Sequence, residues 1–408
     1  MSVIKPFRAL RPVSESAKHV SCVPYDVVHE AEVREFVEHN PQSFLRVTRS
    51  ESAFPANESP SPAAVFQKAK ENLGLMMNEG VIVKEQDAAF YIYRLASDTH
   101  TQTGVVACCS LDEYDEGLIK KHEKTRPDKV KDRTEHMLAI RAQTGLIFLA
   151  FRGTERIHEL IDEATRDVPI YDFESADGIR HTVWRVTDTQ PFVSAFAEVP
   201  ALYIADGHHR AESAALARRE LRQANPAHTG NEDYNYMLAG IFPAEDLKIL
   251  PYNRVIRDLN GMTDEEFLDK LTASFDVSNT GDCDPVNHGE ICMYLGGTWF
   301  TLRFNEDLAD PSNPVERLDV SILQRYVLAP LLGINDPRTD TRIEFIGGSR
   351  GTDELVRLVD SGSARVAFSL YPTTMDDLLT ISDEGQIMPP KSTWFEPKLK
   401  DGLFVHTI

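Results

Sequence analysis

The chain has 408 residues, of which 42% are hydrophobic and 26% charged, and its formal net charge is −21 at pH 7. This length predicts two or three domains, and no apolar run approaches the roughly 18 residues that a membrane-spanning helix needs. The negative charge argues against nucleic acid as a partner, because it would repel the phosphates. The first residues lack the apolar core of a secretory signal, so we expect a cytoplasmic protein that binds no membrane. The sequence leaves open whether the chain forms a homo-oligomer.

The hydrophobic pattern predicts helices and strands in alternation along the chain. Helices are expected at residues 29–40, 63–80, 127–145, 210–225, 267–275 and 318–333. Strands are expected at residues 89–95, 104–111, 146–151, 181–186 and 201–205, and in a hairpin at 291–304. These elements predict a mixed α/β fold with three parts: an N-terminal α/β region (1–100), a central core (101–250) and a C-terminal α/β domain (251–408).

Local signals mark several helix ends and turns. Thr125 with Asp128, and Thr263 with Glu266, have the spacing of a capping box. Gly145 is expected to end the helix that begins near residue 127. The pair Gly-Gly at 296–297 is expected to form the turn of the hairpin.

Five cysteines lie along the chain without a repeated spacing. They are Cys22, Cys108, Cys109, Cys283 and Cys292. An odd number in such a pattern resembles neither a disulfide framework nor a zinc site, so buried, reduced thiols are expected.

The most informative stretch is Asp-Gly-His-His-Arg at residues 206–210, between an expected strand and an expected helix. The first amides of a helix lack internal partners and attract anions. Gly207 permits close approach of a ligand, Arg210 suits phosphate oxygens, and His208 and His209 can donate hydrogen bonds or move protons. Asp206 suggests a magnesium ligand or a base for a hydroxyl group. The alternative is a tight turn with solvated histidines and an arginine paired to a nearby glutamate.

A second cluster gathers basic residues in an otherwise acidic chain. Residues 120–133 contain Lys120, Lys121, Lys124, Arg126, Lys129, Lys131 and Arg133 around Glu123. Such a patch suits a phosphorylated ligand, because phosphoryl transfer depends on charge neutralisation. Pairing of the helical part with neighbouring acidic residues is the equally supported alternative. The segments FIGGSRG (345–351) and MPPKSTWFEPKL (388–399) have no role that the residues alone assign.

The motif IADGHHRAESA resembles the phosphate-binding motif of the ParB/sulfiredoxin-like superfamily, and is closest to its free-serine kinases. The whole chain resembles a prokaryotic family catalogued as a domain of unknown function, the "ten-fifteen" family. This second resemblance rests on VPYDVV, on LDEYDEGLIKKHEKTRPDKVKDR, and on the two C-terminal segments named above.

The superfamily resemblance implies a nucleotide-binding core of the ParB/sulfiredoxin type, with Gly207, His208, His209 and Arg210 at the phosphates. By the same resemblance, Glu123 is the base that activates a substrate hydroxyl. Asp206 and His209 are the further catalytic candidates, and Asp206 is the candidate ligand of Mg²⁺. Lys124 and Arg126 are the additional candidates for contact with ATP or ADP.

Three functions follow from these residues. The leading one is a nucleotide-dependent phosphotransferase that acts on a small hydroxyl metabolite, with L-serine favoured by the resemblance. The second is a phosphatase of a small phosphorylated metabolite such as phosphoserine. The third is a non-enzymatic, ParB-like nucleotide-binding regulator, against which the net charge and the absence of a basic recognition helix argue.

Overall fold

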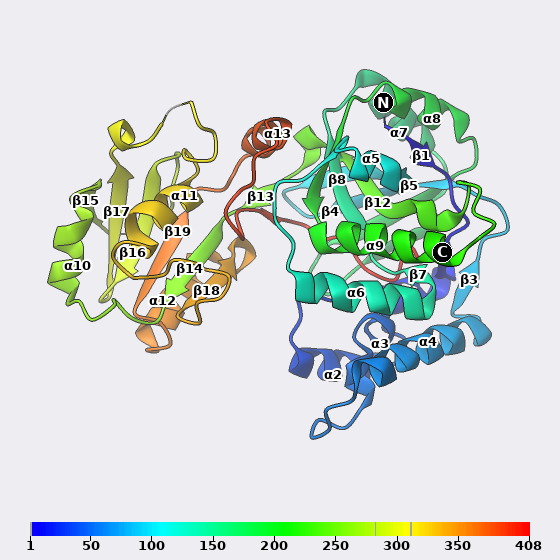
Figure 1. The fold of residues 1–408 in the computed structure, drawn as a ribbon, viewed down its shortest axis with the longest axis horizontal. Helices are drawn as coiled ribbons and strands as arrows, with labels where there is room; N and C mark the ends of the chain where they lie inside the picture. The colour runs from blue at the N-terminus through cyan, green and yellow to red at the C-terminus, as the bar shows by residue number, and fades with distance from the viewer. Residues whose placement is uncertain (1, 282, 311) are drawn as a thin grey trace. The chain divides into compact units, whose positions relative to one another are not determined.

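The computed structural model describes residues 2–281, 283–310 and 312–408. The chain divides into two compact units, which are described separately (Figure 1). The first comprises the described residues up to Lys121, together with Thr125–Leu247 and Pro397–Ile408. The second comprises His122–Lys124 and Lys248–Glu396. Both units combine helices and strands, which confirms the mixed α/β class.

The first unit is built on a large, mixed sheet with the strand order β6-β11-β8-β12-β5-β4-β10-β9, in which β1 also pairs with β5. Most neighbours are antiparallel, whereas β12 pairs with β8, and β11 with β6, in parallel. The strands are β1 (Ile4–Lys5), β4 (Phe90–Ala96), β5 (Thr101–Ser110), β6 (Ile119–Lys120), β8 (Ile147–Phe151), β9 (Tyr171–Glu174), β10 (Arg180–Val186), β11 (Leu202–Asp206) and β12 (Tyr236–Pro243).

The helices of this unit contribute to two separate core clusters. The main core joins strand residues to the alanine-rich face of α9 and to apolar residues of α7 and α8. A second core joins α2, α3 and α4 with the end of α6. The helices of this unit are α1 (Ala17–Val20), α2 (Glu30–His39), α3 (Leu45–Thr48), α4 (Pro62–Asn78), α5 (Leu111–Asp115), α6 (Pro127–Ile140), α7 (Glu155–Ala164), α8 (Gln190–Ala197) and α9 (His208–Ala224). Because helices cover it, strands such as β5 and β8 are buried along nearly their whole length.

The second unit has an antiparallel sheet with the order β15-β17-β16-β19-β14-β18. Its strands are β14 (Tyr252–Ile256), β15 (Phe275–Thr280), β16 (Glu290–Leu295), β17 (Thr298–Phe304), β18 (Ile343–Gly347) and β19 (Val366–Leu370). Its helices are α10 (Asp264–Leu271), α11 (Asp319–Leu323), α12 (Gly351–Asp360) and α13 (Met375–Asp383). Leu355 and Val359 of α12 pack against this sheet in one core cluster.

Six short strands, in three pairs, complete the two units. In the first unit, β2 (Leu10–Pro12) pairs with β3 (Ile82–Lys84), and β7 (Ala142–Gln143) pairs with β21 (His406–Thr407). In the second unit, β13 (Ile249–Leu250) pairs with β20 (Trp394–Phe395). The two C-terminal motifs meet in this unit, because a Cβ atom at Gly347 would lie within 3 Å of the Trp394 ring.

The structure divides the chain differently from the predicted regions. Residues of the predicted N-terminal region supply β1 and β4, which pair with β5 of the predicted central core. At the other end, Pro397–Ile408 joins the first unit rather than the second. Strand pairing between distant segments carries no local sequence signal, which explains both differences.

Local sequence signals predict correctly those features that neighbouring residues determine by themselves. The capping box of Thr263 and Glu266 is present, and the hairpin turns at the two glycines between β16 and β17. The proposed cap at Thr125 is wrong, because Arg126 precedes α6 and no side chain caps it. The end at Gly145 is also wrong, since α6 stops at Ile140 and Arg141 takes a left-handed conformation with φ 55°.

The cysteine prediction holds for three residues and fails for two. Cys22, Cys108 and Cys109 are buried free thiols. Cys283 and Cys292 form a disulfide in the second unit, because the loop before β16 returns to the sheet and brings their Cα atoms 5.7 Å apart.

In the described part of the chain, no helix has both the length and the apolar character needed to cross a bilayer.

Candidate functional site

The Asp-Gly-His-His-Arg motif forms a strand–turn–helix junction in the first unit. β11 ends at Asp206, Gly207 takes a left-handed conformation with φ 95°, and α9 begins at His208. The first regular helical bond runs from the Ala211 N–H to the Gly207 carbonyl, at 3.0 Å. The amides before Ala211 therefore have no acceptor within α9, which is the arrangement that attracts anions.

Gly207 is required at this junction for two reasons. Its positive φ is strained for residues with a Cβ atom. A Cβ atom would also lie 3.2 Å from Arg210 Nε and 3.5 Å from the Cα atom of Ile147. The turn is thus closed tightly over the arginine side chain.

Arg210 lies beneath the turn rather than on the surface. Only 8% of the residue is exposed, and its Nη1 donates a hydrogen bond to the carbonyl of Leu146. Burial by itself would lower the pKa of this guanidinium, but the negative charges of Asp26, Asp206 and Asp401 outweigh it and raise the pKa above its usual value. Arg210 is therefore a fixed cation behind the amides of the turn.

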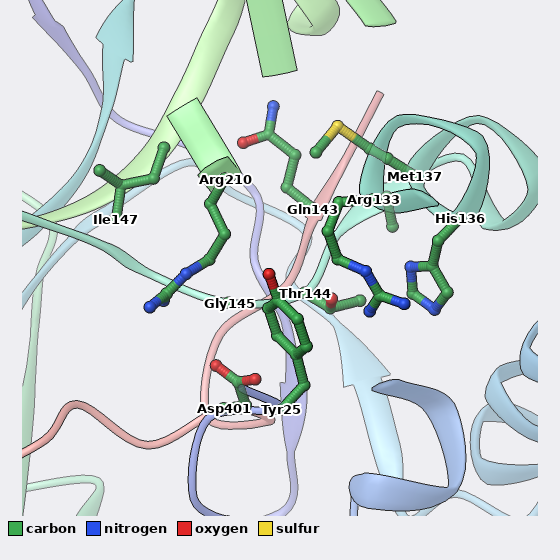
Figure 2. A pocket seen from close by; sticks show the side chains of 11 residues that line it. Tyr25, Arg133, His136, Met137, Gln143, Thr144, Gly145, Ile147, Arg210 and Asp401 are labelled. Atoms are coloured by element: carbon green, nitrogen blue, oxygen red, sulfur yellow. The ribbon is translucent and has the colours of Figure 1, made fainter. Parts of the chain in front are cut away.

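The guanidinium faces a small polar cavity within the first unit, which also receives Tyr25, Arg133 and Asp401 (Figure 2). The cavity volume is about 30 Å³, which holds about two water molecules. Among the described residues, neither Arg210 Nε nor Asp401 Oδ1 has a hydrogen-bond partner. Ordered water in this cavity is the natural partner of both atoms, since buried polar groups are rarely left unsatisfied.

Asp401 gives this cavity an unusual acid. It is 2% exposed, and its backbone pairs with that of Cys22 through N–H to carbonyl bonds of 2.9 and 3.1 Å. Burial raises the pKa of its carboxyl to about 7, although the positive Arg210 opposes that rise. A side chain at Gly145 would lie 2.6 Å from Asp401 Oδ1, so the carboxyl is held closely.

The carboxylate of Asp206 is engaged by groups of the chain itself. Its Oδ1 accepts a hydrogen bond from the Gly207 N–H at 2.8 Å. Its Oδ2 lies 3.0 Å from Lys398 Nζ and 3.9 Å from Arg210 Nη2. Magnesium requires carboxylate oxygens that it can approach to about 2.1 Å in octahedral geometry. These contacts pair Asp206 with two cations of the protein, and its role as a magnesium ligand stays a prediction.

The two histidines of the motif differ in their surroundings. His208 is 5% exposed, whereas His209 is partly exposed. His209 Nε2 accepts a hydrogen bond from the backbone N–H of Arg126, at 3.0 Å. This bond connects the turn to the basic segment, 83 residues earlier in the chain, and it leaves Nδ1 as the protonated nitrogen of a neutral ring.

The basic side chains of residues 120–133 form more ion pairs with nearby acidic residues than the composition of the segment suggests. The Arg126 guanidinium donates two hydrogen bonds to Asp128, and Lys131 pairs with Glu135 at 3.8 Å. Lys124 is exposed, and Lys121 Nζ lies 3.7 Å from Glu212 Oε2 on α9. The helical half of the segment therefore matches the alternative of a solvated face, while the preceding loop remains near the start of α9.

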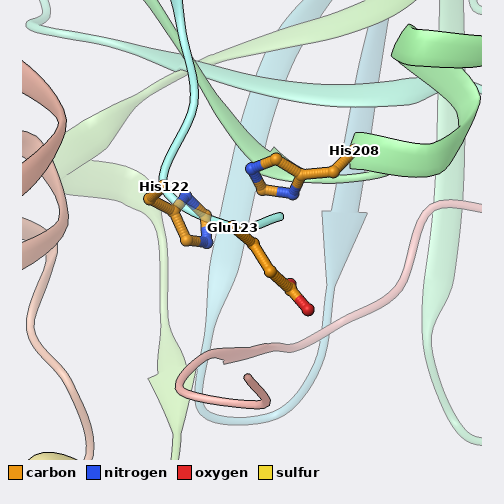
Figure 3. A group of neighbouring side chains, drawn as sticks. All are labelled: His122, Glu123 and His208. Carbon is orange, nitrogen blue, oxygen red and sulfur yellow. The ribbon is translucent and has the colours of Figure 1, made fainter. Parts of the chain in front are cut away.

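Figure 3 shows His122 and Glu123 on the loop before α6, and His208 on the first turn of α9. All three are residue types that bind metals. His122 and Glu123 belong to the second unit and His208 to the first. In the second unit, the His122 carbonyl accepts the Met388 N–H at 2.8 Å, which joins this loop to the MPPKSTWFEPKL segment.

The family described as "Protein of unknown function (DUF1015)" matches residues 4–321. The chain belongs to this family, which confirms the family that the motifs indicated. Among curated proteins, none matches the chain.

Three solved structures illustrate what the chain is similar to. A C-terminally truncated SbnI from Staphylococcus aureus is 12% identical, with 72% of this chain and 84% of that chain covered and a TM-score of 0.38. A free serine kinase in complex with AMP is 13% identical, with 72% and 86% covered and a TM-score of 0.36. A conserved hypothetical protein from Pyrococcus furiosus is 14% identical, with 74% and 94% covered and a TM-score of 0.36. Similarity at this level assigns no function, so the function is argued below from the residues of this chain.

Two functional candidates escaped the sequence reasoning. Lys398 and Asp401 lie in EPKLKDG, near the C-terminus, where nothing but their charge distinguishes them. The cavity also receives Tyr25, which belongs to the VPYDVV stretch on which the family resemblance rests. Contacts that join the two ends of the chain to residue 206 or 210 leave no local pattern.

The close fit of Gly207 leads to a first prediction. Gly207→Ala should destabilise the protein more than Gly230→Ala, which has a similar φ of 93° but no neighbouring atom within 4 Å of the new Cβ. Both variants carry a backbone cost of about 1–2 kcal/mol, and only Gly207→Ala must also displace Arg210. Urea unfolding of the two variants measures the difference. Equal losses of unfolding free energy would contradict the close fit.

The buried carboxyl of Asp401 leads to a second prediction. An unfolded chain releases this proton near pH 3.9, whereas the folded protein keeps it until about pH 7. The folded state therefore binds more protons between these values, and the contribution of Asp401 to stability is lost as the pH rises from about 4 to 7.

We therefore expect the unfolding free energy of the wild type, relative to Asp401→Asn, to fall by up to about 1.4 kcal/mol per pH unit across this window. Urea unfolding at four pH values tests this, with Asp188→Asn at an exposed position as the control that keeps the wild-type profile. Parallel curves for wild type and Asp401→Asn would show that Asp401 is ionised throughout.

Proposed function

We propose that this protein is a nucleotide-dependent phosphotransferase with a ParB/sulfiredoxin-like core, acting on a small hydroxyl metabolite, with L-serine as the leading substrate. One observation carries the proposal: α9 begins directly after a left-handed glycine, above a buried arginine. Amides that have no acceptor within their own helix, together with a fixed cation, stabilise a phosphate group at the same point.

The phosphates of ATP or ADP would lie at the turn after Gly207, on the amides of His208 and His209. Arg210 would act through its field, because its guanidinium is held below the turn by Leu146. His209 would hold the preceding loop against the turn through the Arg126 amide. Lys124, which is exposed on this loop, would add a mobile cation near the nucleotide.

Chain connectivity supports Glu123 as the base. Lys121 is joined to Glu212 on α9, and Arg126 to His209 on its first turn. Consecutive Cα atoms are about 3.8 Å apart, so the Cα atom of Glu123 lies within about 8 Å of that of Lys121 and about 11 Å of that of Arg126. Both anchors belong to the first unit, so the loop that carries Glu123 stays close to the start of α9.

The proposed step is a direct transfer. The Glu123 carboxylate accepts the proton of the substrate hydroxyl, and the hydroxyl oxygen attacks the terminal phosphorus of the nucleotide. The bond between that phosphorus and its bridging oxygen breaks, and the shortened nucleotide leaves with the electron pair. The turn amides stabilise the charge on the transferred group.

Glu123→Gln tests the assignment of the base. The variant keeps the size of the side chain but cannot accept the proton, so turnover should fall by about 100-fold or more while nucleotide affinity changes little. The measurements are phosphoserine formation from L-serine with ATP or ADP, and nucleotide binding by calorimetry. Glu116→Gln, at an exposed position, is the matched control. Normal turnover by Glu123→Gln would refute the role of Glu123.

The direction of the reaction is decided by a separate incubation with phosphoserine. A phosphotransferase releases serine only when AMP or ADP is present to accept the phosphoryl group. Release of inorganic phosphate without any nucleotide would identify a phosphatase instead. Binding of nucleotide without either reaction would identify a regulator.

A further inference from the structure

The strongest unassigned feature is a buried arginine in the second unit whose partners are all neutral. Arg254 lies on β14, and only 3% of the residue is exposed. Its Nη1 donates a hydrogen bond to the Tyr252 carbonyl, and its Nη2 donates one to the Lys391 carbonyl at 2.9 Å. The guanidinium carbon lies 5.3 Å from the ring centroid of Phe345, on the neighbouring strand β18. None of these groups carries a negative charge, so they leave the buried cation uncompensated.

Arg254 is exceptional among the buried cations of this chain. In the part of the chain that the structure describes, the other buried arginine and lysine residues are Arg210, Arg218 and Lys400. Each of these three lies within 3.9 Å of an aspartate oxygen. Among the described residues, no salt bridge of this kind is formed by Arg254.

The electrostatic surroundings of Arg254 agree with this difference. Burial lowers the pKa of its guanidinium to about 9, and the only ionisable group that opposes the shift is Tyr252. At Arg210, which is also buried, three aspartates instead raise the pKa above its usual value. The interior around Arg254 is therefore arranged for a cation without supplying the anion that a buried arginine normally has.

The turn that covers Arg254 contains a strained residue. Lys391 has a φ of 60°, a left-handed conformation that is unfavourable for a residue with a Cβ atom. In this conformation its carbonyl accepts the Arg254 hydrogen bond, while the residue itself is exposed. The guanidinium thus lies one hydrogen bond away from the backbone of a surface residue. Strain of this kind persists where the surrounding structure holds it, and it is frequent at ligand sites.

Both C-terminal motifs without an assigned role contribute to these surroundings. Phe345 belongs to FIGGSRG, and Lys391 and Trp394 belong to MPPKSTWFEPKL. The Tyr252 ring lies 6.0 Å from the ring of Phe345 and 5.1 Å from that of Trp394. Aromatic rings around a guanidinium exclude water, and the attraction between that cation and an anion is stronger where water is excluded.

We propose that Arg254 anchors an oxyanion site of the second unit, which takes the carboxylate or phosphate group of a small molecule. A guanidinium has more N–H donors than its two carbonyl bonds use, and its planar fork matches the paired oxygens of such a group. The bound anion would supply the negative charge that the described chain does not. All the residues of this site belong to the second unit, so the assignment does not depend on the proposed function.

Calorimetric titration of the full chain with succinate and with inorganic phosphate, at constant ionic strength, tests this site. The wild type should bind at least one probe, and Arg254→Met should bind it roughly 10- to 100-fold more weakly, as expected for the loss of a charged hydrogen bond. Arg254→Lys keeps the charge but not the fork, so its affinity should lie between the two. Arg257→Met removes an exposed arginine close to the same strand and should bind as the wild type does.

Circular dichroism establishes that Arg254→Met is folded before its affinity is compared. If it is not folded, Arg254→Lys decides, because it should still bind more weakly than the wild type. Equal affinity of the folded Arg254 variant and the wild type for both probes would overturn the proposal. Failure of the wild type to bind either probe would overturn it too, as would an equal loss in Arg257→Met.

The two probes distinguish the source of the oxyanion. Arg254-dependent binding of succinate alone identifies a carboxylate ligand, and Arg254-dependent binding of phosphate alone identifies a phosphate ligand. Phosphate that Arg254→Met binds as tightly as the wild type does lies elsewhere, and the succinate titration then decides. None of these results alters the test of the phosphotransferase, which is read from phosphoserine formation.

Discussion

A buried guanidinium must be balanced by nearby negative charge, and this requirement organises the candidate site. Arg210 is removed from water beneath the turn, where an isolated cation would be unstable. Asp206 lies on one side of it, and Asp401 faces it across the small cavity. Asp206 belongs to β11, and Asp401 belongs to the C-terminal segment Pro397–Ile408. Balancing one buried charge therefore connects two segments that are almost 200 residues apart.

The same balance gives the Asp206 carboxylate partners within the chain itself. Its two oxygens are already directed to the Gly207 amide and to Lys398. A carboxylate in this position fixes the turn through the Gly207 amide and the C-terminal segment through Lys398. Under the proposed function, phosphate binding would use amides and cations of the chain that are already in place and would need little reorganisation.

The two units differ in how their cores are built. In the first, helices cover a mixed sheet, and the junction lies where β11 meets α9 at the end of the strand. In the second, an antiparallel sheet packs against α12, and a disulfide joins β16 to the loop before it. The two C-terminal motifs that the sequence left without a role meet inside this unit, where Trp394 lies over Gly347. Packing of Trp394 against Gly347 therefore explains why a glycine stands in one motif and a large ring in the other.

The sequence alone determined the elements whose causes are local. Hydrophobic periodicity located β4, β8 and α9, and the pair Thr263 and Glu266 marked the start of α10. The junction at Asp206–Arg210 was also readable, because a glycine before a helix and a cluster of polar residues are contiguous signals. The cap at Thr125 failed because whether a hydroxyl reaches the helix amides depends on how the preceding loop is held.

Only the tertiary structure decided which charges surround that junction. Nothing near residue 206 indicates that its partner is Lys398, or that Arg210 points inward to Asp401 rather than outward to solvent. Ion pairs and buried cavities arise when distant segments pack, and their formation depends on burial and distance rather than on neighbouring residues. The disulfide between Cys283 and Cys292 illustrates the same limit, since its formation required a loop to fold back on a strand.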